Sequence, residues 1–271
     1  MRELITHTDL DGLGCIFILQ RAGIKFDKIW LCDSPQDFDP FKLSSVEIAN
    51  KNWRVKRGNE LFITDLDIRI NGAKIFDHHG DKDGLECGTL LLANYYGSYL
   101  TKDDLEFAKS VDAFDRWLED SPYWSRGVRL QLSFLNHRYL VGRVRDSMRE
   151  LDQKFRSILN TITLEDDRGI AFQRKRIRNS ITQAEKDLRI GIDQAGNSFI
   201  YWEFSGEVSF TTNEILKKFK EADYAIIFYT SGRVSARSRN GFDCRSLYGI
   251  DGHSSAAGGI SSDELLDFLN L

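Results

Sequence analysis

Histidines and aspartates are concentrated in four short segments of the first 115 residues. Three of these segments directly follow apolar runs, and they contain His7, Asp9 and Asp11, then Asp65, then Asp77, His78 and His79; the fourth contains Asp112 and Asp115. Alternate residues of an extended segment point to the same side, so the imidazole and the two carboxylates of the first segment can converge. Gly12 then allows the backbone to turn into the next helix.

The mixture of imidazole and carboxylate groups predicts what these segments bind. Carboxylates gathered in one place repel each other unless cations neutralise them. Imidazole together with carboxylate suits manganese, iron or zinc better than calcium. A pair of such ions can bind a phosphate group, activate water and stabilise a leaving oxygen. The pattern therefore predicts a two-metal hydrolase of phosphoesters.

Apolar runs alternate with helical patterns in this part of the chain. Strands are predicted at residues 3–6, 27–32, 61–64 and 73–76, and helices at residues 12–22, 87–100 and 102–117. Strands that alternate with helices predict an α/β domain with a mainly parallel sheet flanked by helices. Ligands of such sheets bind beyond the carboxyl ends of the strands, which is where the acidic residues fall.

The rest of the chain predicts a helical connector and a smaller C-terminal α/β domain. Residues 135–186 have a charged helical pattern with breaks near 161–169. Strands are predicted at residues 189–193, 199–204, 224–229 and 233–238, and helices around 213–221 and 262–269. We therefore expect three parts: residues 1–133, residues 134–187 and residues 188–271.

Bulk composition excludes several classes of protein. No apolar run is long enough for a membrane span, and the N-terminus lacks the apolar core of a signal peptide, so we expect a cytoplasmic protein. The four cysteines form no C-x-x-C pair, which disfavours a disulfide framework or a structural zinc site. We expect the cysteines to be small residues of the hydrophobic core. With a formal net charge of -4, phosphate binding would depend on local arginines and metal ions. The basic run at residues 174–178 is expected to face water, and His137 is expected to be structural.

The four segments, taken in order, resemble the motifs of the DHH phosphoesterase superfamily. They read HTDLDG, the strand-terminal Asp65, FDHHG and VDAFDRW. Near the C-terminus, VSARS (residues 234–238) and GIDGHSSAAGG (residues 249–259) resemble the DHH-associated substrate-binding domain, which typically ends in Gly-Gly-His-x-x-Ala-Ala-Gly. The resemblance covers both ends of the chain and leaves only the connector unmatched.

The resemblance implies a role for each residue of the first domain. His7, Asp9 and Asp65 would hold one divalent ion, and Asp11, Asp65, His78 and Asp115 would hold the other, with Asp65 as the bridge; Mn²⁺ is the expected metal. Asp77 would orient the histidine pair, and His79 would stabilise charge or donate a proton at the scissile phosphate. Asp115 is preferred to Asp112 because the family often has an aromatic residue, an aspartate and a tryptophan two positions later.

In the second domain the resemblance implies a substrate-binding set: Ser235, Arg237, Ser238, Gly252, His253 and Gly258. An arginine fork suits a phosphate that is not cleaved. The backbone of the glycine-rich tail would hold the terminal nucleotide. Asp251 stands where the family signature has glycine, and its carboxylate could narrow the pocket, repel a phosphate or bind a sugar hydroxyl.

The resemblance favours an exonuclease that degrades short oligonucleotides (nano-RNA) to 5′-mononucleotides. The first motif looks most like the nano-RNase branch, and 271 residues leave little room for an added nucleic-acid-binding domain. Expected substrates are short single-stranded RNA or DNA oligonucleotides or dinucleotides, for a monomer or homodimer. Alternatives are a phosphodiesterase of linear or cyclic dinucleotides, a 3′-phosphoadenosine 5′-phosphate phosphatase and a single-stranded DNA exonuclease. A catalytically silent nucleotide-binding protein is an alternative of another class.

Overall fold

The computed structural model describes residues 1–49, 51–79, 86–141, 148–151, 166–203, 207–239, 241–253 and 255–271, without the side chains of residues 137–141, 251 and 253. It divides into two compact units, Met1–Gln173 and Arg174–Leu271. The boundary falls inside helix α6 (Asp167–Asp187), within the segment predicted as a connector. In the described part of the chain, no helix combines the length and apolar character needed to cross a membrane.

The first unit is built on a five-stranded sheet with the order β6-β5-β1-β2-β7. The strands are β1 (Arg2–His7), β2 (Lys28–Cys32), β5 (Glu60–Thr64), β6 (Lys74–Phe76) and β7 (Arg149–Glu150). The first four are parallel, and β7 pairs antiparallel with β2, so the predicted α/β fold with a mainly parallel sheet is confirmed. Strand β7 was not predicted, because two residues are too few for a periodic pattern.

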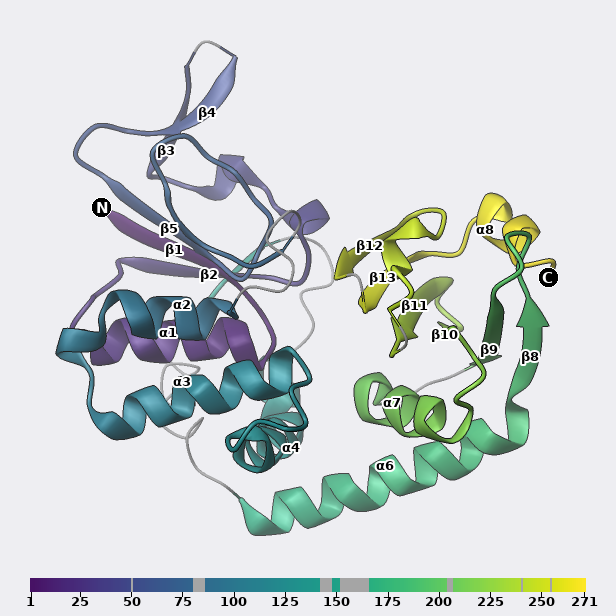
Figure 1. Cartoon of the computed structure of the whole chain (residues 1–271). Helices are drawn as coiled ribbons and strands as arrows, with labels where there is room; N and C mark the ends of the chain where they lie inside the picture. Colours follow the sequence, from purple (N-terminus) through teal and green to yellow (C-terminus); the bar gives the residue numbers. More distant parts are fainter. Residues whose placement is uncertain are drawn as a thin grey trace. The chain divides into compact units, whose positions relative to one another are not determined.

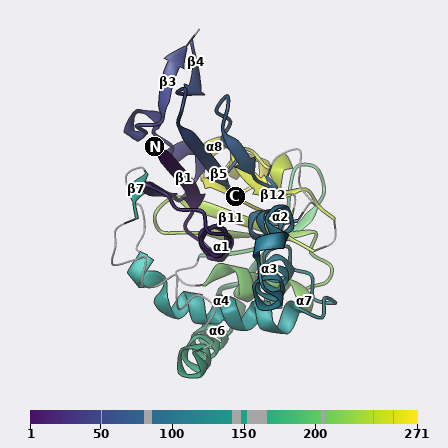
Figure 2. The same ribbon diagram turned by 90° about the vertical axis from the view of Figure 1, so that its left-hand side faces the viewer.

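Three helices lie along one face of this sheet (Figures 1 and 2): α1 (Leu10–Arg21), α2 (Gly88–Tyr95) and α3 (Lys102–Asp115). Helix α4 (Trp124–Val141) follows and packs on α3; it contains His137, whose side chain lies outside the described part. The helix predicted over residues 87–100 was too long. It ends at Tyr95 and is followed by a 3₁₀ turn, Gly97–Tyr99.

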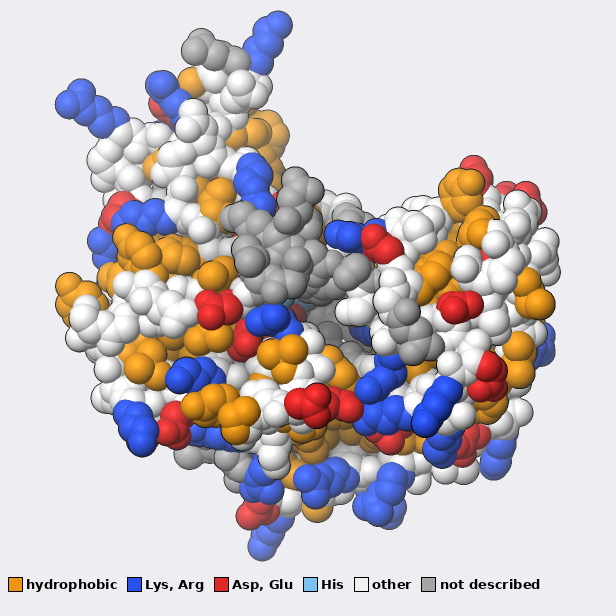
Figure 3. All heavy atoms as spheres, in the orientation of Figure 1, with side chains coloured by type: hydrophobic (Ala, Val, Ile, Leu, Met, Phe, Trp, Pro, Cys, Tyr) orange, Lys and Arg blue, Asp and Glu red, His pale blue; other side chains and the backbone are white. Residues whose placement is uncertain are grey.

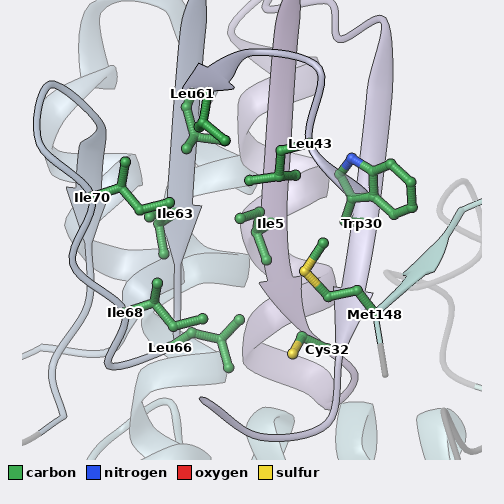
Figure 4. Close-up of a cluster of buried hydrophobic side chains, with 11 residues drawn as sticks. Ile5, Trp30, Cys32, Leu43, Leu61, Ile63, Leu66, Ile68, Ile70 and Met148 are labelled. Carbon is green, nitrogen blue, oxygen red and sulfur yellow. The ribbon is translucent and has the colours of Figure 1, made fainter. Parts of the chain in front are cut away.

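A buried apolar cluster occupies the sheet face opposite the helices (Figure 4). It includes Ile5 of β1, Trp30 of β2 and Ile63 of β5. Leu66, Ile68 and Ile70, from the segment that joins β5 to β6, complete it. Because this segment alternates buried and exposed side chains, its path from Asp65 to Asp77 is fixed by hydrophobic burial.

A two-stranded antiparallel hairpin, β3 (Val46–Ala49) and β4 (Asn52–Val55), lies between β2 and β5 in sequence. It projects beyond the five-stranded sheet in both ribbon views (Figures 1 and 2). This hairpin was not among the elements predicted from the sequence.

The second unit contains a six-stranded sheet with the order β12-β13-β11-β10-β9-β8. The strands are β8 (Arg189–Ile192), β9 (Ser198–Glu203), β10 (Tyr224–Phe228), β11 (Arg233–Ser238), β12 (Ile250–His253) and β13 (Ala256–Ile260). Strands β9 and β10 are parallel and are joined through helix α7 (Val208–Lys218), while the other described pairs are antiparallel. The chain ends with helix α8 (Asp263–Phe268). The helix predicted over residues 213–221 was displaced, because Glu207 caps α7 at an earlier position.

The glycine-rich tail forms strands β12 and β13, which were not predicted. A Cβ atom at Gly259 would lie 2.1 Å from the carbonyl oxygen of Gly249, so the two chain segments can approach only with glycine at this position. All four cysteines are free and buried, which confirms them as core residues. Arg174 and Arg178 of the basic run are exposed on α6, along which Figure 3 shows Lys and Arg side chains.

The buried carboxylate of Asp193 joins separate parts of the second unit. It accepts hydrogen bonds from the backbone N of Asn197 at 2.8 Å and from the Tyr224 hydroxyl at 2.8 Å. Burial acts to raise the pKa of Asp193, but the hydrogen bonds from Asn197 and Tyr224 bring it below its usual value. The carboxylate is therefore more stable as an anion in the folded unit than in the unfolded chain.

We expect Asp193→Ala to lower the free energy of unfolding by about 1–3 kcal/mol at neutral pH, because it leaves the Tyr224 hydroxyl without an acceptor. Since the folded pKa is lowered, this stabilisation is present above the unfolded pKa of about 3.9 and is lost as the pH falls through the folded value. Urea unfolding at several pH values measures both effects. Tyr224→Phe, which removes only the hydroxyl, should cost about 1 kcal/mol. Equal stability of wild type and Asp193→Ala at neutral pH would contradict this account.

Candidate metal centre

The histidines and aspartates of the four motifs gather at the carboxyl ends of β1, β5 and β6. Strand β1 continues through α1 to β2 on one side, whereas β5 continues to β6 on the other side. Strands β1 and β5 are therefore neighbours whose outgoing connections diverge, and such a switch point is where open α/β sheets bind ligands. Thr6 and Thr64 pair across these strands just before the motifs begin.

His7, Asp9 and Asp65 form the first group that could hold a metal ion. His7 Nδ1 lies 2.8 Å from Asp9 Oδ2 and 3.6 Å from Asp65 Oδ2. The other ring nitrogen, Nε2, lies 2.9 Å from the carbonyl oxygen of Asp33, to which it can donate a hydrogen bond. Thr8 Oγ1 donates to the Asp33 carboxylate and helps to hold this residue in place. The ring is thereby oriented with Nδ1 toward the carboxylates.

His78 lies at the meeting point of two further groups, Asp11 with His78 and Asp115, and Asp65 with His78 and His79. Its Nε2 is 3.4 Å from Asp65 Oδ1, 3.4 Å from Asp115 Oδ2 and 3.9 Å from Asp11 Oδ2. Asp65 belongs to two of the three groups, as a bridging ligand would. The structure thus brings together all six predicted metal ligands, and their function as ligands stays a prediction.

Asp65 is the central residue of these groups. Its backbone φ is 53°, in the left-handed region that residues other than glycine rarely adopt, and its side chain is almost fully buried. Among the described residues, Asp65 Oδ2 and Asp115 Oδ2 are buried oxygens that accept no hydrogen bond. A buried carboxylate oxygen without a donor is unfavourable, and a divalent cation would remove that deficit. The residues present therefore fit a metal ion.

The titration behaviour of the cluster indicates a shortage of positive charge. Burial raises the pKa of Asp65 well above its usual value, and the charges of Asp9 and Asp11 raise it further. Burial and the charge of Asp11 likewise raise the pKa of Asp115. Burial alone would lower the pKa of His7, but Asp9 and Asp65 raise it well above its usual value. Metal ions would compete with protons for these groups, because a carboxylate or imidazole must be deprotonated to bind a metal.

Asp11 also anchors helix α2. Its Oδ2 accepts a hydrogen bond from the backbone N of Gly88 and its Oδ1 accepts one from the backbone N of Thr89, both at 2.8 Å. Asp112 Oδ1 accepts a hydrogen bond from the backbone N of Cys87 at 2.8 Å, at the same helix start. Asp112 is in none of the candidate metal groups among the described residues, whereas Asp115 is, so the two helical aspartates have different surroundings.

Asp77 and His79 form a pair at the edge of the cluster, and His79 also belongs to the group of Asp65 and His78. His79 Nδ1 lies 2.7 Å from Asp77 Oδ1. Although burial acts in the opposite direction, the hydrogen bond from His79 lowers the pKa of Asp77 to about 2. Arg69, which was not among the predicted site residues, reaches Asp77 Oδ2 with Nη1 at 3.3 Å and Nη2 at 3.4 Å. The sequence feature that could have indicated this role is the position of Arg69 between two of the motifs, in the segment that joins β5 to β6.

Gly12 is required by the backbone of the first motif. A Cβ atom at this position would lie 2.3 Å from the carbonyl oxygen of His7. The Asp9 side chain caps helix α1 by accepting a hydrogen bond from the Gly12 backbone N at 2.9 Å. The turn that brings Asp9 and Asp11 toward His7 is therefore closed too tightly for any larger residue.

Three of the predicted substrate-binding residues, Ser235, Arg237 and Ser238, lie on β11 but not all on the same face of it. Arg237 Nη1 donates to Ser235 Oγ at 2.9 Å and to the carbonyl oxygen of Ala236 at 2.9 Å. Ser238 alternates to the other face, where its hydroxyl donates to the carbonyl oxygen of Phe242. The structure therefore brings Ser235 and Arg237 together and does not bring Ser238 to them.

The glycine-rich tail lies beside these residues in the sheet. Gly258 of β13 pairs with Ser235 of β11, and Gly252 of β12 pairs with Ala257 of β13. Gly252 has a φ of 135°, which favours glycine. The backbone of His253 belongs to β12, but its side chain and that of Asp251 lie outside the described residues.

No family model matches the chain, and no curated protein matches it in sequence. Solved structures match its fold over almost its whole length. The DHH domain of a member of a family of ribosomal proteins has a TM-score of 0.62 and 12% identity, covering 99% of this chain and 85% of its own. The pGpG-specific phosphodiesterase PggH from Vibrio cholerae has a TM-score of 0.58 and 16% identity, and the match covers 98% of this chain and 95% of PggH.

The exonuclease RecJ from Thermus thermophilus in complex with Mn²⁺ has a TM-score of 0.50 and 14% identity. The match covers 97% of this chain and 50% of RecJ. These structures have the DHH fold, so the resemblance inferred from the four motifs is confirmed at the level of the fold.

The Asp65→Asn variant should distinguish the effect of charge repulsion on stability from the effect of metal binding on stability. Asparagine tolerates the left-handed backbone, and the substitution removes one of the crowded charges, so the metal-free variant should be at least as stable as the wild type. Excess Mn²⁺ should raise the melting temperature of the wild type by mass action and that of the variant much less. Differential scanning calorimetry with EDTA or MnCl₂ measures both quantities. Asp67→Asn, a half-exposed neighbour, is the matched control and should keep the full shift. A full shift in Asp65→Asn would exclude Asp65 as a ligand.

Proposed function

We propose that this chain is a metal-dependent phosphodiesterase that degrades short oligonucleotides, including nano-RNA, to 5′-mononucleotides. The main support for this proposal is that the six predicted ligands lie close together. Within the described part of the chain, buried oxygens of Asp65 and Asp115 accept no hydrogen bond, as expected of oxygens that bind a metal ion. The fold supports the proposal, because similar structures include a pGpG-specific phosphodiesterase and the exonuclease RecJ.

The metal centre would hold two divalent ions, with Mn²⁺ as the expected metal. His7, Asp9 and Asp65 would bind one, and Asp11, Asp65, His78 and Asp115 the other. This mixture of imidazole and carboxylate ligands suits manganese. When bound, such ions supply Lewis acidity and an activated water. The oxygens of Asp11 that cap α2 would also tie the ion site to the start of that helix.

The residues of the chain would orient the substrate and move a proton. His79 Nδ1 lies 2.7 Å from Asp77 Oδ1, and the His79 side chain is 23% exposed, so the imidazole would be positioned by Asp77 to act as the proton donor to a leaving oxygen. Arg69 helps to keep Asp77 ionised and in place. In the second unit, Ser235 and Arg237 would bind a phosphate that is not cleaved, and Gly252, His253 and Gly258 would bind the terminal nucleotide.

A linear dinucleotide is the second candidate substrate. The observation that favours it is the likeness to PggH, which covers nearly all of both chains. A dinucleotide and a slightly longer oligonucleotide present the same terminal phosphodiester, so one site can serve both. The proposed enzyme would act in the cytoplasm as a monomer or homodimer.

Substrate length should decide between these possibilities. With Mn²⁺, we expect a dinucleotide and a five-nucleotide RNA to be cleaved faster than a long single strand, because the second unit would bind only a few nucleotides. The panel should include five-nucleotide DNA and a cyclic dinucleotide, with products separated by chromatography. Dinucleotide turnover alone would favour the second candidate. A long strand cleaved as fast as the short ones would exclude the proposed specificity.

The adjacent histidines provide a matched pair of variants. His78→Ala should lose both Mn²⁺ binding and hydrolysis, because His78 faces three carboxylates. His79→Ala should keep Mn²⁺ binding but lose about 10²–10⁴-fold in kcat, the usual contribution of a proton donor. Isothermal titration calorimetry and steady-state kinetics measure the two properties, and circular dichroism checks the fold. Equal loss of metal in both variants would refute the division of roles.

A further inference from the structure

The β3–β4 hairpin and the turn that precedes it present three apolar side chains, Phe41, Ile48 and Trp53, which we call the hairpin patch. Phe41 is 79% exposed and Ile48 is 59% exposed. Ile48 lies opposite Trp53 in the strand register, so both side chains are on one face of the hairpin. The Phe41 ring contacts the Trp53 ring edge-to-face, with centroids 5.0 Å apart. Trp53 is half-buried and packs against the hydrophobic cluster of the first unit, so the patch is attached to the core.

Cationic side chains are concentrated on the same segment. Residues 41–58 contain five Lys and Arg side chains and one carboxylate, Glu47, in a chain with a formal net charge of -4. Arg54 pairs with Glu47. Lys51 is exposed and Arg57 is exposed, and neither makes an ion pair among the described residues. Figure 3 shows Lys and Arg side chains on this projecting part of the molecule.

Hydrogen bonds fix the hairpin to the first unit. The backbone N of Val55 donates to the Asn71 carbonyl oxygen at 2.9 Å, and the Asn71 N donates to that of Trp53 at 3.3 Å. The backbone N of Ser45 donates to Glu3 Oε2 at 2.7 Å. The patch is thus held in place before any partner arrives, and a preorganised surface loses less entropy on binding.

We propose that the hairpin patch is a docking surface for single-stranded nucleic acid, separate from the metal centre. Exposed aromatic rings beside cations are the combination that stacks bases and binds the phosphate backbone without sequence preference. A second copy of this chain fits less well, because two such segments would bring like charges together. The choice of nucleic acid as the partner rests on the proposed function.

The hairpin lies at the opposite end of the sheet from the metal centre. Its base contacts Glu3, near the start of β1, whereas the motif residues follow the carboxyl ends of the strands. The six residues of β1 separate its two ends by about 20 Å, which is more than a dinucleotide at the metal centre would span. The patch would therefore bind a remote part of a longer strand or a separate strand.

Binding of a labelled single strand of about ten nucleotides tests the inference. Fluorescence anisotropy with the full chain in EDTA prevents hydrolysis. Phe41→Ala should weaken binding about tenfold or more through lost stacking. Replacing both Lys51 and Arg57 by alanine should weaken binding and lower the slope of log affinity against log salt by about 1.4. Tyr99→Ala, at a 70% exposed aromatic outside the hairpin, and Lys25→Ala should bind like the wild type.

Equal affinity of the wild type and both hairpin variants would overturn the inference. So would loss of binding to phosphatidylserine vesicles with unchanged binding of the oligonucleotide, which would assign the patch to a membrane. A dimer in sedimentation that Phe41→Ala dissociates, with oligonucleotide binding unchanged, would assign it to a second copy. Failure of the proposed function appears separately, as no hydrolysis with Mn²⁺. Single-strand binding in EDTA that depends on Phe41 and the two cations would support the patch even then.

Discussion

Mutual repulsion among buried carboxylates is the constraint on which this structure depends. Asp9, Asp11, Asp65 and Asp115 lie around His7, which ends β1, and His78, which follows β6, and Asp11 and Asp65 are almost fully buried. In a medium of low dielectric, such charges separate unless cations or protons intervene. The rest of the first unit holds them in place. The hydrophobic cluster fixes the β5–β6 segment, Gly12 closes the first turn, and the capping bonds to Asp11 attach the start of α2.

Much of this arrangement followed from local sequence. The first three motifs each follow an apolar run of β-branched and aromatic side chains, and parallel strands place their ends on one edge of the sheet. The order of the motifs identified the candidate ligands, and the structure gathers them. The choice of Asp115 rather than Asp112 as a metal ligand depended on the family resemblance, because both are aspartates on the same helix and their local sequence does not distinguish them. Only the contacts show that Asp112 accepts a hydrogen bond from the Cys87 amide.

Other features depend on partners that are distant in sequence. Strand β7 consists of two residues and exists because β2 offers a free edge. Strands β12 and β13 are rich in glycine, which disfavours strands. The absence of a side chain at Gly259 of β13 nevertheless allows this strand to lie close to Gly249, the residue before β12. The hairpin exposes Ile48 rather than burying it, so its pattern is not that of a core strand. Arg69 acquires its importance only where it meets Asp77.

The distribution of hydrogen bonds within the cluster indicates where a cation would act most strongly. Asp9 caps α1, Asp11 caps α2, and Asp77 is held by His79 and Arg69, so each of these carboxylates has donors from the protein. Asp65 Oδ2 and Asp115 Oδ2 have none within the described part. These two oxygens come from a strand end and from helix α3, so a metal ion bound to them would join two elements that otherwise repel each other there. Metal binding and the stability of the first unit are therefore expected to be coupled.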